Sequence, residues 1–158
     1  MWLERPHLER RLRPGIRVVS IVAGPGYGKT VLAARLFEAW TGPKLWYSLD
    51  HTDADLAVFA AHLDAGLRAL DPDVPALDTA DAAGMGSPKE VGGRFADALA
   101  GRDSGGSPLL VFDDAHTIDG SRTLAALSEL IGRGFRHGAC FIVTGRAIPV
   151  LSLIHISE

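Results

Sequence analysis

The sequence predicts a three-layer α/β domain built on a parallel β-sheet. Short runs of β-branched and apolar residues alternate along the chain with longer segments whose apolar residues recur at helical spacing. This alternation is typical of units in which a helix connects two parallel strands. The 158 residues are enough for one domain with a substantial core.

Four short runs have the composition of strands. The first, residues 17–23, is continuous and β-branched, as expected of a strand that is buried on both faces. The other three runs, LWYSL at 45–49, LLVFD at 109–113 and CFIVT at 140–144, follow in order along the chain. Cys140 lies in the last run and is interpreted as a small buried hydrophobic residue.

Helices are expected between these strands. The first covers about 30–40 and is stopped by Thr41-Gly42-Pro43. Residues 52–55 offer capping oxygens to a second helix that reaches about Leu70, where Asp71-Pro72 ends it.

Two further helices follow an acidic loop, which is predicted at 71–87. Ser87-Pro88-Lys89-Glu90 is a capping box that opens a helix to about Ala100. Regularly spaced leucines mark another helix from near Ser121, and a turn is expected at 104–108.

Composition excludes several classes of protein. With 47% hydrophobic and 22% charged residues, the chain is too apolar for a disordered protein, and no apolar run approaches the ~20 residues of a membrane-spanning helix. The charged N-terminal stretch is unlike a secretion signal, and a lone cysteine excludes a disulfide framework. These observations favour a reducing, cytoplasmic location, and the net charge of −3 gives no general attraction to nucleic acid.

A glycine-rich loop separates the first predicted strand from its helix. Residues 23–30 read AGPGYGKT, the phosphate-binding loop pattern with alanine in place of the first glycine. Glycines permit a curled backbone whose N–H groups point at phosphate oxygens, and the helix N-terminus adds a positive potential. Lys29 is expected to bind the β- and γ-phosphates and Thr30 to ligate Mg²⁺. The residues predicted to contact the nucleotide are Gly24, Gly26, Tyr27, Gly28, Lys29, Thr30 and Val31.

Two aspartates end the third predicted strand. Because ligands bind at the carboxyl ends of parallel strands, Asp113 is expected beside Thr30 and Mg²⁺. Asp114 is the candidate to polarise an attacking water. The alternative interpretation is that the two carboxylates only cap the turn that follows.

The fourth predicted strand ends in Thr144-Gly145-Arg146, a polar residue and a cation that would be placed to contact the γ-phosphate and sense hydrolysis. Arg146 is therefore a candidate catalytic residue together with Lys29 and Asp114, and the alternative is a solvated surface arginine. The six histidines show no metal-ligand spacing. His116 is interpreted as a hydrogen-bonded structural histidine in preference to a site residue.

Taken together, these motifs resemble a known family. The strings VAGPGYGKT, LWYSLDHTDADLAVFAAHL, LLVFDDAH and FIVTGRAIP follow in the order and spacing of STAND-class nucleotide switches. They are most similar to the large ATP-binding LuxR-type transcriptional regulators of the maltose-regulon-activator type, over about residues 5–153. The resemblance implies a P-loop NTPase core of the additional-strand type in residues 1–153, with ATP or ADP and Mg²⁺ as ligands. Slow Mg²⁺-dependent hydrolysis would then reset a conformational switch.

The resemblance also implies roles for particular residues. Lys29 and Thr30 match the phosphate and Mg²⁺ residues, Asp113 matches the Mg²⁺ acid, and Arg146 matches the arginine after the fourth strand. The segment around 5–12 would lie near the adenine.

Family members are several hundred residues longer than this chain. One of their further strands flanks the first strand, so without it residues 17–23 would form an open sheet edge. Residues 154–158 fit no family pattern and are expected to be a non-native or disordered tail. DNA binding is expected only through a C-terminal domain of the parent protein. This segment is therefore expected to bind nucleotide, and neither nucleic acid nor membrane, and nucleotide-dependent self-association of the parent protein is left open.

Two alternatives remain open. One is a free-standing P-loop ATPase or kinase, although a small-molecule kinase would want an arginine-rich lid and residues 71–87 contain no arginine. The other is a truncated module that binds no nucleotide because its core cannot close. A nucleotide titration would identify a truncated module that binds no nucleotide. The turnover rate would separate a switch from a free-standing kinase, since kinases turn over many times per second.

Overall fold

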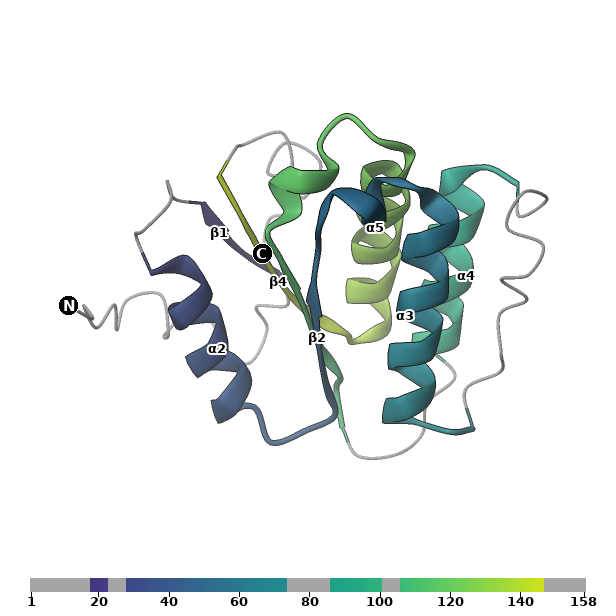
Figure 1. Ribbon diagram of the computed structural model, residues 1–158. Coiled ribbons are helices and arrows are strands. Elements are labelled where there is room, and N and C mark those ends of the chain that lie inside the picture. The colour runs from purple at the N-terminus through teal and green to yellow at the C-terminus, as the bar shows by residue number, and fades with distance from the viewer. Residues whose placement is uncertain (1–17, 23–27, 74–85, 101–105, 147–158) are drawn as a thin grey trace.

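The structure is a computed structural model that describes residues 18–22, 28–73, 86–100 and 106–146. These residues form a parallel four-stranded sheet with helices on both faces (Figure 1), which confirms the predicted α/β class. The strands are β1 (Val18–Val22), β2 (Lys44–Ser48), β3 (Leu109–Asp113) and β4 (Cys140–Gly145). The helices are α2 (Lys29–Ala39), α3 (Leu56–Leu70), α4 (Pro88–Ala100) and α5 (Arg122–Gly134).

The strand order is β1-β4-β3-β2, and all three pairings are parallel. The central strands β3 and β4 are buried along their whole lengths, which explains their continuous apolar sequences. Among the described residues β1 lies at one edge of the sheet, as the resemblance implies, and β2 lies at the other.

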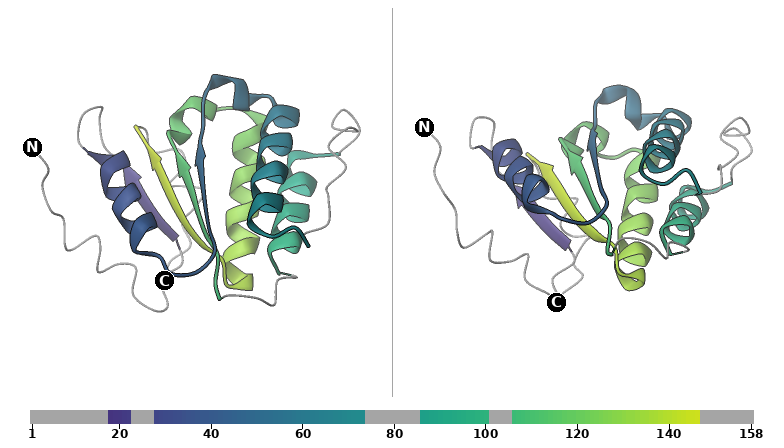
Figure 2. Two further views of the ribbon diagram at one scale, coloured as in Figure 1. Left: turned by 60° about the horizontal axis from the view of Figure 1, so that its bottom comes forward. Right: turned by 90° about the horizontal axis from the view of Figure 1, so that it is seen from below.

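The core divides into two parts because successive strand residues point to opposite faces of the sheet. Leu109 and Val111 of β3 pack with α2 on one face. Leu110 and Phe112 pack with α3, α4 and α5 on the other. Figure 2 shows the same arrangement, with α2 on one side of the described sheet and α3, α4 and α5 on the other.

Side-chain caps begin most of the helices where the sequence indicates. Asp55 accepts a hydrogen bond from the Ala57 N–H at 2.9 Å and starts α3. Ser87 accepts from the Glu90 N–H at 3.2 Å at α4, and Ser121 accepts from the Leu124 N–H at 3.3 Å at α5.

Three short 3₁₀ helices were not expected from the sequence. They are η2 (His51–Ala54), η4 (Ala115–Ile118) and η5 (Phe135–His137). The first corrects the prediction at 52–55, because most of that segment forms η2 and only Asp55 caps α3. Of the acidic loop at 71–87, residues 74–85 lie outside the described part, as do residues 1–17 and 154–158. Among the described helices, none is long and apolar enough to cross a membrane.

Helices α4 and α5 approach each other closely at two adjacent glycines of α4. A Cβ atom built on Gly92 would lie 2.2 Å from the Ala126 carbonyl oxygen, and one on Gly93 would lie 2.3 Å from an Arg133 guanidinium nitrogen. A backbone carbonyl cannot move aside as a flexible side chain can. Gly92 is therefore required by packing even though glycine is a weak helix former.

The substitution Gly92→Ala is expected to lower the free energy of unfolding by about 1–3 kcal/mol, because overpacking outweighs the better helix propensity of alanine. Gly132→Ala is the matched control, since a Cβ there meets nothing within 4 Å, and it is expected to stabilise the chain by about 0.5–1 kcal/mol. Urea unfolding followed by circular dichroism measures both values. Equal stabilisation by the two substitutions would contradict the close-approach argument.

Candidate functional site

The candidate site lies where β3 ends and α2 begins. The Thr30 hydroxyl donates a hydrogen bond to Asp113, with 3.1 Å to Oδ1 and 3.3 Å to Oδ2. These residues are 83 positions apart in the sequence. The structure thus brings together a hydroxyl and a carboxylate that the sequence assigned to the same Mg²⁺ ion.

No side chain caps the N-terminus of α2, so its first backbone N–H groups are not bound by a capping side chain. Gly28 occupies the N-cap position in a left-handed conformation, with φ 74° and ψ 19°, and no side chain caps the helix. Lys29 follows as the first helical residue and is buried, whereas Val31 is exposed. A helix N-terminus with a lysine beside it favours bound anions. The other predicted contact residues, Gly24, Gly26 and Tyr27, lie outside the described residues.

Asp113 has a second hydroxyl partner that sequence reasoning did not identify. Thr144 at the end of β4 is fully buried and donates a hydrogen bond to Asp113 Oδ1. Its oxygen also accepts the Asp114 N–H at 3.0 Å. The sequence predicted Thr144 only as a polar residue placed to contact the γ-phosphate, and its hydrogen bonds to the two aspartates were not expected.

Asp114 adopts a left-handed backbone conformation, with φ 61° and ψ 44°. Although it occupies the N-cap position of η4, its side chain makes no capping hydrogen bond. The alternative interpretation, in which this carboxylate only caps the turn after β3, is therefore not supported for Asp114.

His116 differs from its sequence interpretation. It is half-buried, and its Nδ1 is shielded from solvent with no hydrogen-bond partner among the described residues. The hydrogen bond expected of this histidine is therefore not made by Nδ1 among the described residues. Burial lowers the pKa of His116, the Asp114 carboxylate opposes this effect, and the charges of Arg146, Lys29 and His51 lower the pKa further.

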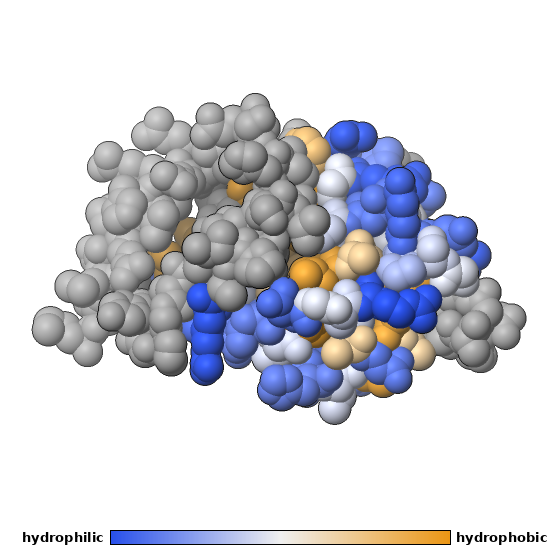
Figure 3. Space-filling model, turned by 90° about the horizontal axis from the view of Figure 1, so that it is seen from above, coloured by the Kyte–Doolittle hydropathy of each residue, from blue (hydrophilic) through white to orange (hydrophobic). Residues whose placement is uncertain are grey.

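Lys29, Asp114 and Arg146 thus all act electrostatically on His116. Arg146 is exposed just after β4. This exposure agrees with a solvated arginine and leaves the guanidinium accessible to a ligand. Figure 3 looks onto the end of the molecule where the strands finish, and on its described part hydrophilic residues surround smaller apolar areas.

The oxygen atoms at the site fit Mg²⁺ bound together with a nucleotide. The described residues contain no group of three or more His, Cys, Asp or Glu side chains that would hold a metal by themselves. Magnesium bound with a nucleotide needs few protein ligands, since phosphates and water supply the others. The Thr30 hydroxyl and the Asp113 carboxylate supply two oxygens of the required kind.

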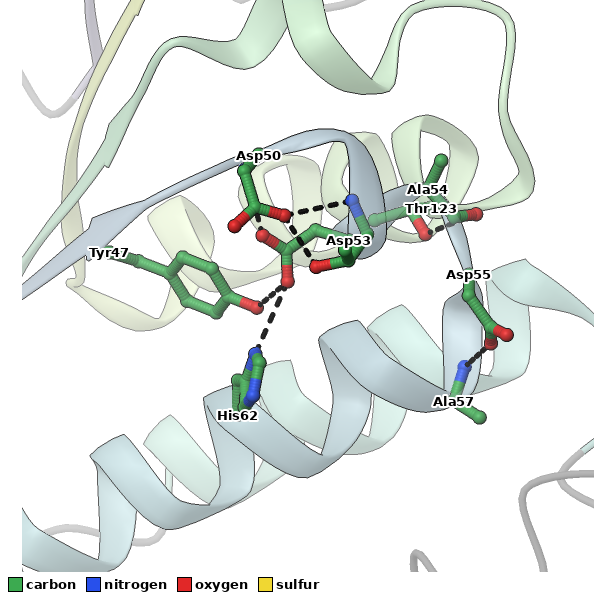
Figure 4. A network of polar contacts seen from close by, with 9 residues as sticks. Tyr47, Asp50, Asp53, Ala54, Asp55, Ala57, His62 and Thr123 are labelled. Carbon is green, nitrogen blue, oxygen red and sulfur yellow. Dashed lines mark hydrogen bonds and ion pairs between the residues drawn. The ribbon is translucent and has the colours of Figure 1, made fainter.

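A polar network centred on the buried Asp53 side chain lies next to this site (Figure 4). The Tyr47 hydroxyl donates to Asp53 Oδ1 at 2.5 Å, and the Asp50 N–H donates to Asp53 Oδ2 at 2.9 Å. His62 Nδ1 lies 3.3 Å from Asp53 Oδ1. The Tyr47 ring packs against Phe112, the residue before Asp113, with 5.9 Å between ring centroids. The network therefore supports the end of β2 beside the carboxyl end of β3.

Tyr47→Phe is expected to lower the free energy of unfolding by about 1–3 kcal/mol at neutral pH, because buried Asp53 loses a hydrogen-bond donor. Burial, the hydrogen bond to Asp53 and the charges of Asp53 and Asp50 raise the pKa of Tyr47. The unfolded chain thus releases this proton near pH 10 while the folded chain retains it, so stability falls as pH rises above about 10.

Above that pH, the wild-type advantage over Tyr47→Phe should shrink by about 1.4 kcal/mol per pH unit. Urea unfolding of both proteins between pH 8 and about 11 measures this difference in the free energy of unfolding. A difference that stays constant with pH would show that the hydroxyl does not hold its proton as inferred.

No protein-family model and no curated protein matches the sequence. Among solved structures, the chain is similar to a DNA replication initiation factor, with a TM-score of 0.48 and 14% sequence identity. The match covers 97% of this chain and 39% of that protein, so this chain spans well under half of its length.

Proposed function

We propose that the chain binds ATP or ADP together with Mg²⁺ and forms the nucleotide-switch core of a STAND-class, LuxR-type regulator. The observation that carries this proposal is the hydrogen bond of 3.1 Å from the Thr30 hydroxyl to the Asp113 carboxylate. It joins the end of the phosphate-binding loop pattern to the acid that such a loop requires for its metal.

The start of α2 supports nucleotide binding in particular. The left-handed Gly28, the lysine that follows it and the absence of a side-chain cap are the features that a polyphosphate site needs at a helix N-terminus. Asp113 receives its described hydrogen bonds from neutral hydroxyls. Its negative charge is therefore not cancelled by these partners and remains available to attract a cation.

In this proposal each residue has a separate task. Lys29 binds the β- and γ-phosphates, and Thr30 with Asp113 holds Mg²⁺, which neutralises phosphate charge when bound. Asp114 orients a water molecule toward the γ-phosphate, and Arg146 binds the same phosphate. Hydrolysis is slow, so the main effect of the bound nucleotide is to set the conformation of the protein.

The assignment to a switch is supported by the sequence resemblance and by the strand order. Strand β1 lies at an edge of the described sheet, where the resemblance implies that a further strand of the family pairs. A regulatory role belongs to the parent protein, since DNA recognition is proposed for a further domain. Steady-state turnover of many per second would favour the kinase or ATPase alternative.

Lys29→Ala is expected to weaken ATP binding at least about tenfold, because it removes a charge-assisted contact worth about 1.5–3 kcal/mol. Isothermal titration measures the affinity, and far-UV circular dichroism shows whether the fold is retained. Lys89→Ala is the matched control, since Lys89 is an exposed lysine in the first turn of α4. Unchanged ATP affinity in a folded Lys29→Ala protein would refute the site.

Asp113→Asn is expected to weaken binding of Mg²⁺-ATP about tenfold more than binding of ATP in EDTA, because the amide lacks the charge that holds the metal. Asp119→Asn, at an exposed position after η4, is the control for loss of one negative charge. Equal losses with and without Mg²⁺ would argue against a metal role for Asp113.

A further inference from the structure

We propose that Thr144 is the positioning residue that fixes both aspartates of the site, orienting the Asp113 carboxylate and holding Asp114 in its left-handed conformation. This inference rests on the proposed nucleotide-binding function and extends it to a residue that does not itself bind nucleotide. The juxtaposition that carries it is a fully buried hydroxyl bonded to the side chain of one aspartate and to the backbone of the next.

The two partners of the Thr144 hydroxyl determine which hydrogen bond it donates and which it accepts. A backbone N–H can only donate, so the Thr144 oxygen accepts from Asp114, at 3.0 Å. A hydroxyl has one hydrogen, and Thr144 donates it to Asp113 Oδ1. Its proton is thus already used within the protein, and Thr144 has no second proton to donate to a phosphate oxygen.

Asp114 needs such support because its conformation is unfavourable. It is the only non-glycine residue with positive φ in the described part of the chain, and this region costs an L-residue roughly 1–2 kcal/mol. Hydrogen bonds on both sides hold it there. Thr144 accepts its N–H at 3.0 Å, while the Thr117 hydroxyl and N–H donate to its carbonyl at 2.8 and 3.1 Å.

The left-handed turn decides where the second carboxylate lies. In a continued strand, side chains at 113 and 114 would point to opposite faces of the sheet. The strand instead ends at Asp113, and the charge of Asp114 acts on His116 together with the charges of Lys29 and Arg146. The left-handed turn at Asp114 therefore takes the second carboxylate out of the side-to-side alternation of the strand.

The strand register explains why Thr144 reaches both residues. Phe112 of β3 pairs with Val143 of β4, so the next residue on each strand is Asp113 and Thr144. Both strands are buried to their ends, and Thr144 itself is fully buried. Loss of the hydroxyl would leave the Asp114 N–H without this partner and Asp113 without one of its two hydroxyl donors.

The test compares three substitutions in the 158-residue chain. Thr144→Val removes the hydroxyl at nearly constant volume, and Thr144→Ser restores it. Thr123→Val is the matched control, because Thr123 is also fully buried and its hydroxyl bonds to a distant backbone group, the Ala54 carbonyl, at 3.1 Å.

With ATP, Thr144→Val is expected to reduce kcat about tenfold or more, because the acids lose their alignment. Its affinity for metal-free ATP should change less than about threefold, since the phosphate contacts remain. Thr144→Ser should recover most of the rate. Thr123→Val should lower the thermal midpoint similarly and leave kcat unchanged.

A second readout does not depend on nucleotide. Titration of His116 by NMR should show a lower pKa in Thr144→Val, because a displaced Asp114 carboxylate no longer opposes the effects of burial and of Arg146, Lys29 and His51. Thr144→Ser and Thr123→Val should titrate as the wild type does.

The outcomes separate this inference from the proposed function. Failure of the wild type to bind ATP would overturn the proposed function, and the His116 titration would still decide the role of Thr144. The inference would be overturned if Thr144→Val kept the wild-type kcat or lost no more kcat than Thr123→Val. It would also be overturned if the His116 titration were unchanged in Thr144→Val. Failure of Thr144→Ser to recover activity would do the same.

Discussion

The site depends on the Asp113 carboxylate, which accepts hydrogen bonds from two threonine hydroxyls on different elements. Thr30 comes from the start of α2 and Thr144 from the end of β4. Asp113 is only 5% exposed, and a buried carboxylate is stable only when hydrogen-bonded. Neutral hydroxyls meet that need without cancelling the charge, so the same contacts that make burial tolerable leave the carboxylate able to bind a cation.

The strand order brings Thr144 next to Asp113, because β4 and β3 are neighbouring strands. Strand β4 pairs with both β1 and β3, with Ile21 opposite Thr144 on one side and Phe112 opposite Val143 on the other. On the other side of β3, the Leu49 N–H donates to the Asp113 carbonyl at 2.9 Å. Asp113 is thus held by its side chain and by its backbone, and Tyr47 with Asp53 supports the neighbouring end of β2.

The sequence was informative where local composition determines structure. Buried parallel strands must be apolar throughout, so β3 and β4 were predictable from LLVFD and CFIVT. The proximity of Thr30 and Asp113 followed from the shared edge of parallel strands. The hydrogen bonds of Thr144 to the two aspartates were not predictable, because they depend on the register between strands that are distant in sequence. Residues 52–55 were expected to cap the helix that follows, but only Asp55 caps α3, and Asp53 belongs to the capping box of η2. A 3₁₀ helix and an α-helix N-terminus have similar capping sequences, so the sequence did not separate the two.

The two aspartates that follow β2 and β3 show how similar sequence signals lead to different uses. Asp50 and Asp114 both occupy the N-cap of a 3₁₀ helix, and these helices, η2 and η4, pack against each other. Asp50 accepts from the Thr52 N–H at 2.8 Å and caps η2 in the ordinary extended conformation. The Asp114 side chain makes no capping hydrogen bond, and its left-handed backbone is held by Thr144 and Thr117. Strain without a local structural benefit is typical of functional positions, and this contrast favours a ligand-directed role for the Asp114 carboxylate.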